Sequence, residues 1–213
     1  YIARLIAKGY KVAICEQTED PAQARGLVDR DIIRVITPGT VISSSMLEDS
    51  RNNYICAVYA DSAAFGLCLC DISTGEMYAS SFPAGEEGLG HLENELARFH
   101  PAEAVLSSGA WNAEGLVPFL KERLGCLCEN GGEARFRVGA ARPLAERQFK
   151  AGLQDVPAQD EAAIQAAGGL LAYLYETQKT DLSHISALTY YTAGQFMELD
   201  LTARQTLELT ATM

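Results

Sequence analysis

Three acidic side chains in this sequence could together form a catalytic site: Asp61, Asp71 and Glu76. Each lies in or beside a short turn between β-rich segments. Carboxylates gathered at strand ends can hold the two divalent metal ions of a nuclease. The segment 71–76 (DISTGE) is also typical of a plain hairpin, in which Asp71 and Ser73 accept hydrogen bonds from turn amides. We favour the hairpin, because turns are where Asp accumulates for this structural reason.

Other catalytic motifs are missing from the sequence. It contains no G-x-x-x-x-G-K-[ST] phosphate-binding loop, no G-x-S-x-G and no H-E-x-x-H. We therefore expect no catalytic site, no nucleotide site and no metal site in this chain.

Six cysteines raise the question of metal binding or disulfides. Two pairs, Cys68/Cys70 and Cys126/Cys128, have C-x-C spacing, and the other two are Cys15 and Cys56. This spacing differs from the C-x-x-C of ribbon-type zinc sites. Cysteines in apolar segments behave as small buried hydrophobic residues. We therefore expect reduced thiols and a cytoplasmic protein.

The net charge of −11 argues against an autonomous nucleic-acid-binding domain, which would have a basic face. The charge is uneven, because residues 1–50 carry six basic and seven acidic side chains while residues 51–190 carry ten and eighteen. Any contact with DNA is therefore expected in the first segment. No apolar run approaches the ~18 residues that would span a membrane.

The first fifty residues predict a small α/β unit. A helix ends near Lys8, and strands are expected over 11–15 and 32–36. Pro38 and Gly39 fit the central positions of a type II turn. The polar segment 43–53 is typical of a linker, so we place the first unit at 1–45 and the linker at 46–53.

The next segment changes from strands to alternating strands and helices. β-rich runs at 54–60, 65–71 and 76–82 predict an antiparallel meander. Leu89, Leu92, Leu96 and Phe99 have helical spacing, and Pro101 follows them. The remaining predicted elements are a strand at 103–107, a helix at 114–124, a weaker fifth strand at 134–138 and helices at 144–150 and 160–179. Two glycines inside the last helix, Gly168 and Gly169, predict a close backbone approach to the sheet.

This element order is that of an RNase H-like domain, an α/β fold with a mixed five-stranded sheet and flanking helices. We predict the strand order 3-2-1-4-5 within a single unit at 54–185. After it, residues 186–213 are expected to enter a helix capped by Thr202. Both ends of the chain have helical patterns, which suggests a piece of a longer protein.

Several short motifs occur in an order that resembles the MutS family. They are YIARL at 1–5, VAICEQ at 12–17, RVITPGT at 34–40, DISTGE at 71–76, GGLL at 168–171 and MELD at 197–200. The first three resemble the second half of the mismatch-binding domain. The next two resemble the connector domain, and the last resembles the start of the helical core domain. The resemblance covers the whole chain in order.

The resemblance implies a role in DNA mismatch repair. MutS proteins bind mispaired or looped double-stranded DNA as homodimers and, with ATP and Mg²⁺, recruit MutL. The family's mismatch-wedge motif and its ATPase motifs do not occur in these residues. The resemblance therefore implies a scaffold and connector piece without its own cofactor. Two rival hypotheses stay open, a metal-dependent RNase H-like nuclease and a purely structural interaction module.

Two arginines are the candidates for contact with the DNA backbone. Arg30 lies where family members place a basic residue before the second strand, and Arg34 lies within that strand. Asp29 and Asp31 flank Arg30 and weaken its local potential. A solvated charge at the edge of a loop is an equally good explanation of Arg30.

Overall fold

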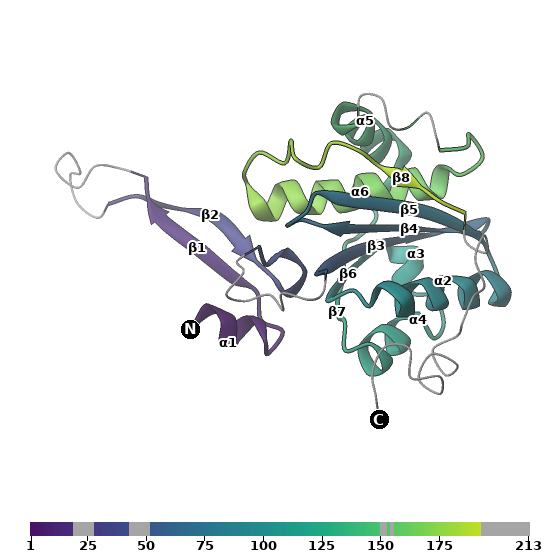
Figure 1. The fold of residues 1–213 in the computed structure, drawn as a ribbon, viewed down its shortest axis with the longest axis horizontal. Coiled ribbons are helices and arrows are strands. Elements are labelled where there is room, and N and C mark those ends of the chain that lie inside the picture. The colour runs from purple at the N-terminus through teal and green to yellow at the C-terminus, as the bar shows by residue number, and fades with distance from the viewer. Residues whose placement is uncertain (19–27, 43–51, 150–152, 154–155, 193–213) are drawn as a thin grey trace.

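The computed structural model describes residues 1–18, 28–42, 52–149, 153 and 156–192. Its first part is a hairpin that projects from the main body (Figure 1). Helix α1 (Ile2–Ile6) precedes strand β1 (Val12–Gln17), which pairs antiparallel with β2 (Arg30–Ile36). The two predicted strands are thereby confirmed. A small core of Ile6, Ile36 and Val41 packs beneath them.

The main body is built on a mixed six-stranded sheet. Its strands are β3 (Tyr54–Ala60), β4 (Ala64–Asp71), β5 (Glu76–Pro83), β6 (Glu103–Leu106), β7 (Leu127–Asn130) and β8 (Thr189–Tyr190). The order is β7-β6-β3-β4-β5-β8. The meander β3-β4-β5 is antiparallel, whereas β6 runs parallel to β3 and to β7. The first five strands have the predicted order, 3-2-1-4-5.

Two details of the predicted sheet were wrong. A sixth strand, β8, pairs in parallel with β5 and extends the sheet beyond the predicted five. The fifth strand is β7, while the predicted segment contains the 3-10 helix Ala134–Phe136. Phe136 is fully buried there because it packs into the core beneath α6. The strand prediction failed because a short apolar run is compatible with a helical turn as well as with a strand.

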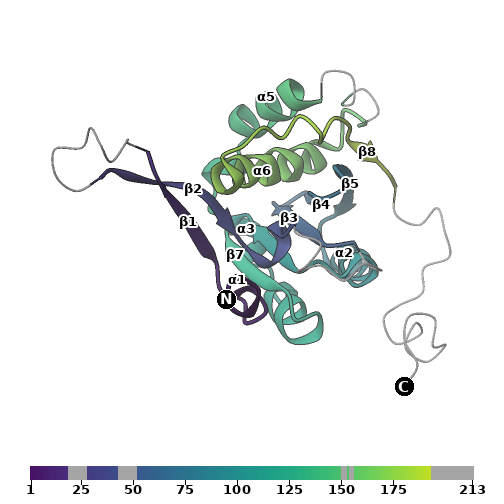
Figure 2. The ribbon, with the colours of Figure 1, turned by 60° about the vertical axis from the view of Figure 1, so that its left-hand side comes forward.

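Helices cover both faces of the sheet (Figures 1 and 2). One face carries α2 (Glu86–Phe99), α3 (Ser108–Trp111), α4 (Leu116–Pro118) and the π-helical turn Phe119–Arg123. The other carries α5 (Val138–Gln148) and α6 (Glu161–Gln178). Each face of the sheet has its own hydrophobic core, and successive residues of a strand contribute their side chains to the two cores in turn. This explains why the strands are apolar on both sides rather than alternating.

The helix predicted at 144–150 begins earlier than expected, at Val138, and includes Pro143. The helix predicted at 114–124 begins at Leu116, after Gly115 in the left-handed region (φ +85°). Helices α2 and α6 confirm the predictions made from their spacing. Residues 46–51 of the predicted linker and the predicted helix capped by Thr202 lie outside the described residues.

The glycines in α6 do not approach the sheet. A Cβ on Gly168 would lie 2.3 Å from the carbonyl oxygen of Ala141 in α5, and one on Gly169 would lie 2.5 Å from the Phe136 ring. The close approach of α6 to the sheet occurs at Gly66 of β4, where a Cβ would lie 1.9 Å from the carbonyl oxygen of Ala162. The prediction of a tight backbone approach was correct, but the partner it named was wrong.

Candidate functional site

Glu103 is a fully buried carboxylate where the hairpin meets the main body. It is the first residue of β6, paired with Ile55 of β3 and with Leu127 of β7. The side chain of Ile55 belongs to the core beneath α6. Because side chains directly opposite on neighbouring strands share a face, the register turns Glu103 toward α6. A buried carboxylate is costly unless hydrogen bonds and counter-charges compensate it.

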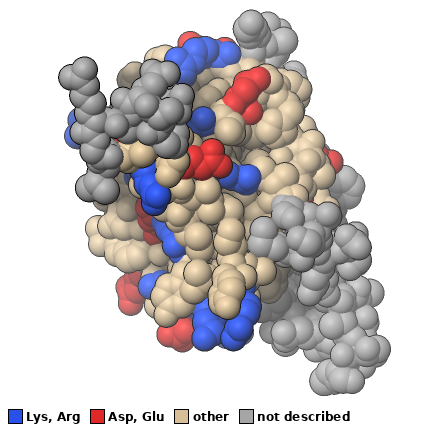
Figure 3. Space-filling view, turned by 90° about the vertical axis from the view of Figure 1, so that its left-hand side faces the viewer, with Lys and Arg blue, Asp and Glu red and all other residues tan. Residues whose placement is uncertain are grey.

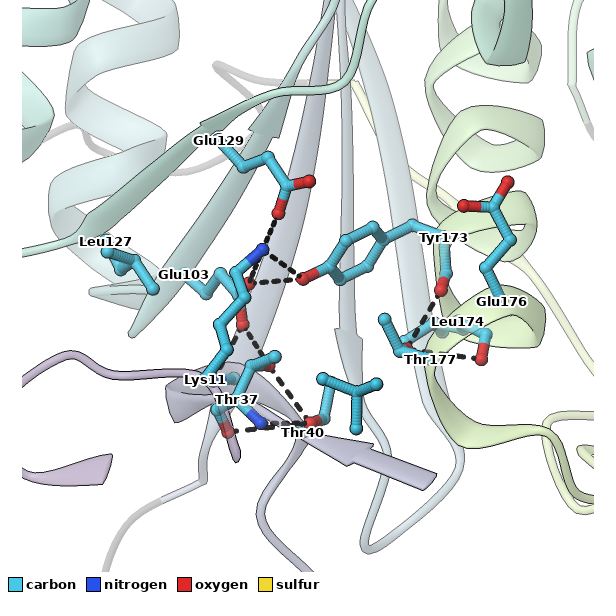
Figure 4. A network of polar contacts seen from close by, with 12 residues as sticks. Lys11, Thr37, Thr40, Glu103, Leu127, Glu129, Tyr173, Leu174, Glu176 and Thr177 are labelled. Atoms are coloured by element: carbon cyan, nitrogen blue, oxygen red, sulfur yellow. Dashed lines mark hydrogen bonds and ion pairs between the residues drawn. The ribbon is translucent and has the colours of Figure 1, made fainter. Parts of the chain in front are cut away.

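Groups from three segments provide that compensation (Figure 4). Tyr173 of α6 donates its hydroxyl to Oε1 at 2.7 Å. The backbone amide of Gly39 donates to Oε2 at 3.1 Å, and the Thr37 hydroxyl donates to the same oxygen. Lys11 places Nζ 3.9 Å from Oε1. We call Lys11, Thr37, Gly39, Glu103 and Tyr173 the Glu103 junction.

Lys11 brings the start of β1 into this junction. Its Nζ donates to the carboxylate of Glu129 on β7 and to the Tyr173 hydroxyl at 3.1 Å. Partial burial lowers the pKa of Lys11, and the adjacent Glu103 carboxylate opposes that shift. The ammonium group therefore links the hairpin to two strands and one helix of the main body.

The segment Pro38–Thr40 forms a 3-10 turn that directs the Thr37 hydroxyl and the Gly39 amide toward Glu103. Thr37 caps the turn, and its backbone amide donates to Thr40 Oγ1 at 2.8 Å. The type II turn expected here is wrong, since Gly39 is not among the glycines with positive φ. Glycine is needed for space instead: a Cβ on Gly39 would lie 2.9 Å from the Cβ of Glu103.

Arg34, predicted to contact DNA, lies beside this junction. Its Nε donates to Gln178 Oε1 of α6 at 2.9 Å, and its Nη2 donates to the Thr40 carbonyl at 3.0 Å. Burial lowers the pKa of Arg34. Arg30 lies at the opposite end of β2, paired with Gln17, and is exposed. The structure therefore separates the two candidates: Arg30 is exposed, whereas Arg34 is partly buried and held by two hydrogen bonds.

The three candidate carboxylates of a nuclease are not brought together. Asp71 is the last residue of β4 and Asp61 lies in the turn before its first residue, Ala64, so the length of the strand, about 24 Å at ~3.4 Å per residue, lies between them. Two-metal sites hold their ions ~3.5–4 Å apart. Asp61 accepts hydrogen bonds from the amides of Ala63 and Ala64, as a turn residue does.

Asp71 also serves a turn. Its Oδ1 accepts from the amide and hydroxyl of Ser73, at 2.9 and 2.6 Å, and its Oδ2 accepts from the amide of Asn53. Glu76 pairs opposite Asp71 and accepts from Asn52 at 3.1 Å. The hairpin interpretation is confirmed, and the nuclease constellation is not formed by these residues. Among the described residues, no group of three or more His, Cys, Asp or Glu side chains could hold a metal ion.

Sequence reasoning missed Glu103, Tyr173 and Gln178. A usable signal was present, because Glu103 begins the otherwise apolar segment EAVL. A charge at the start of a strand that must be buried on both faces requires partners. The sequence could not show which distant residues supply them.

The face around the hairpin has mixed charge. Figure 3 looks onto this end of the molecule and shows Lys and Arg side chains interrupted by acidic and uncharged ones, without a continuous basic band.

Within the described ranges, no helix is long and apolar enough to cross a membrane.

Alkaline pH should weaken the fold through two tyrosines, the buried Tyr173 and the partly buried Tyr191. Burial and then the Glu103 carboxylate raise the pKa of Tyr173, and burial and then Glu95 raise that of Tyr191. An unfolded tyrosine ionises near its ordinary pKa of 10.0. The stabilisation due to the protonated folded form is therefore complete below about pH 10 and is lost as pH rises further. Urea unfolding at increasing pH should show this loss. Tyr173→Phe should reduce the slope, whereas substitution of the exposed Tyr10 by Phe should not.

Comparison with known proteins identifies the family. The model of MutS domain II matches residues 53–186, and that of MutS domain I matches residues 1–45. The DNA mismatch repair protein MutS of Ruminiclostridium cellulolyticum is 40% identical over 213 residues, covering 100% of this chain and 24% of the relative. The protein of the same name from Pelotomaculum thermopropionicum is 44% identical, covering 99% and 24%. That from Methanococcoides burtonii is 38% identical, covering 98% and 24%. The chain spans about a quarter of the length of these relatives, and it belongs to the MutS family.

Proposed function

We propose that this chain is the scaffold and connector part of a protein that binds mispaired or looped DNA and, with ATP, recruits MutL. Family membership supports the repair role. The Glu103 junction is the observation that supports the connector role, because it fixes the hairpin on the main body through a buried carboxylate. A movement of the hairpin would have to move β6 and α6 or break these bonds.

Helix α6 extends from this junction to the other edge of the sheet. Near the C-terminal end of α6, the Tyr173 hydroxyl accepts from Lys11 and Gln178 accepts from Arg34, and both donors belong to the hairpin part of the chain. At its N-terminal end the cap residue Asp160 accepts from the hydroxyls of Ser81 and Tyr190, at 2.8 and 2.5 Å. Tyr190 belongs to β8, and the next residue, Tyr191, donates to Glu95 of α2 at 2.8 Å. We propose that α6 couples the hairpin to the segment that follows β8.

The nucleotide and the partners belong to the whole protein in this proposal. The 213 residues contain no phosphate-binding loop motif. ATP, Mg²⁺ and the homodimer contacts would then lie in parts of the relatives outside the matched quarter.

Substitution of Arg30 tests whether this chain contributes to DNA binding. In a full-length protein that contains this chain, Arg30→Glu should weaken binding to matched and mismatched duplexes by similar factors, because a phosphate contact carries no base information. Losing one phosphate contact should lower the slope of log K against log salt by about 0.9. Fluorescence anisotropy on both duplexes at several salt concentrations measures both effects.

Arg137→Glu is the matched control, since it makes the same charge change at an exposed position at the start of α5. Equal effects of the two substitutions would mean that Arg30 acts only through net charge. Loss of mismatch binding with matched binding preserved would instead give Arg30 a role in base recognition.

A further inference from the structure

A cleft of about 680 Å³ lies where helix α1 faces the main body. One wall comes from α1 and the turn after it, and the other comes from residues 100–102 and the segment that leads into β7. Pockets of ~300–1,000 Å³ commonly hold small molecules. No member of the Glu103 junction lines the cleft, so it is a separate feature of the fold.

The floor of the cleft is apolar. Four side chains that line it are buried: Ile6, Val41, Leu124 and Cys126. The backbone amide of Leu127, which also lines it, is already paired, because it donates to the Ala102 carbonyl at 3.0 Å. The described residues of the lining include no Phe, Tyr or Trp. The floor therefore suits an aliphatic group better than an aromatic one, which would need a ring to stack on.

The rim of the cleft is basic. Among the described lining residues, the exposed polar side chains are Lys8, His100 and Lys121, and there is no Asp or Glu. None of the three forms an ion pair with a carboxylate in the part of the chain that the structure describes. Lys121 Nζ lies 5.4 Å from the centroid of the Trp111 ring, and this contact leaves its positive charge uncompensated.

This basic rim is a local exception in an acidic chain. The whole sequence has 28 acidic and 17 basic residues, for a net charge of −11. A cleft lined by one sign of charge raises the local concentration of molecules with the opposite sign. An apolar floor below a basic rim therefore matches a ligand that has an apolar body and an anionic end.

We propose that the cleft binds a small amphiphilic anion, a molecule with an aliphatic body and one phosphate or carboxylate head group. The body lies on the apolar floor, where its removal from water stabilises the complex. The head group lies at the rim and accepts charge-assisted hydrogen bonds from Lys8 and Lys121. Ammonium groups recognise phosphate and carboxylate in the same way, so experiment must distinguish the two head groups.

Such a ligand would contact both parts of the chain. Lys8 belongs to the hairpin part and Lys121 to the main body. Pro38, which also lines the cleft, precedes Gly39 of the Glu103 junction. An occupied cleft would therefore add a second connection beside the junction. The site does not depend on the proposed function, because neither its lining nor its charge involves DNA or a partner protein.

Fluorescence titration with dansyl-undecanoate, an aliphatic carboxylate whose emission increases in apolar surroundings, measures binding to the folded chain. We expect one saturable site per chain, and weaker binding as salt screens the charges of the rim. Octyl phosphate and octanoate, each below its micelle-forming concentration, should displace the probe, and the stronger competitor identifies the head group. Octanol and inorganic phosphate each lack one half of the ligand and should compete about tenfold less effectively or worse.

Substitutions test the rim and the floor separately. Lys8→Glu with Lys121→Glu should weaken binding about tenfold, because two attractions become repulsions. Ala7→Trp should prevent binding by filling the cleft, and Ala7 is exposed, so the fold can accommodate the larger side chain. Arg4→Glu with Arg123→Glu is the matched control, since it reverses two exposed charges near the same walls but outside the cleft lining.

Circular dichroism of each variant reports whether it is folded. The proposal fails if the probe does not saturate at one site, or if octanol competes as well as octyl phosphate and octanoate, because charge would then play no part. It fails equally if inorganic phosphate competes as well as the two amphiphiles, or if Ala7→Trp leaves binding unchanged. An effect of the control pair as large as that of Lys8→Glu with Lys121→Glu would also overturn it, since net charge alone would explain both.

Discussion

Replacing Glu103 by alanine should lower the free energy of unfolding by about 3–5 kcal/mol, as expected when one partner of a buried charged network is removed. The substitution takes away the acceptor of the Tyr173 hydroxyl, the Gly39 amide and the Thr37 hydroxyl. Those donors would remain buried without their partner, and each unsatisfied group carries a desolvation cost. Urea unfolding followed by circular dichroism measures the change.

Glu176→Ala is the control for Glu103→Ala, because it removes a carboxylate that pairs with Arg135 at the surface. The Glu176 side chain is 55% exposed, so its loss should cost no more than ~1 kcal/mol. A double-mutant cycle between Glu103→Gln and Tyr173→Phe should give a coupling energy of about 0.5–3 kcal/mol, because the two side chains are in direct contact. Independent effects of the two substitutions would show that the junction does not act as a unit.

The second large effect is expected at Gly168, where alanine should destabilise the protein by a net of about 1–2 kcal/mol. Helix propensity would favour the alanine by ~1 kcal/mol. Its Cβ, however, would lie 2.3 and 2.4 Å from the carbonyl oxygen and Cα of Ala141, which are backbone atoms of α5 and cannot rotate away. The two helices would have to separate, and overpacking of this kind typically costs 1–3 kcal/mol or more. Thermal and urea unfolding measure the balance.

Gly90→Ala is the same substitution in a helix where the added Cβ meets nothing within 4 Å. It should stabilise the protein by about 0.5–1 kcal/mol through the entropy of the unfolded chain and helix propensity. Opposite signs at the two positions would separate close packing from propensity. A stabilising effect at Gly168 would contradict the close approach of α5 and α6.

Local patterns in the sequence were sufficient to predict most of the elements. The likeness of their succession to an RNase H-like domain supplied the order of the first five strands, although the fifth was expected at 134–138 and is β7. Continuous apolar, β-rich runs and turn residues define β3 to β5, and helical spacing defines α2 and α6. Asp71 and Ser73 indicated their own turn, because the hydrogen bonds involved span only two residues. The family resemblance also rested on such contiguous motifs, and the matches to MutS domains I and II confirm it.

Only the tertiary structure determined which residues meet. Glu103 is separated from Thr37 by 66 positions and from Tyr173 by 70, so no local pattern links them. The same holds for Arg34, which the sequence offered as a DNA contact and the fold pairs with Gln178, 144 positions away. Local preferences act over a few residues, whereas the partner of a buried charge is set by strand register and helix packing. A sequence can therefore show that Glu103 needs partners, but the packing of β6 against the hairpin and α6 decides which ones it has.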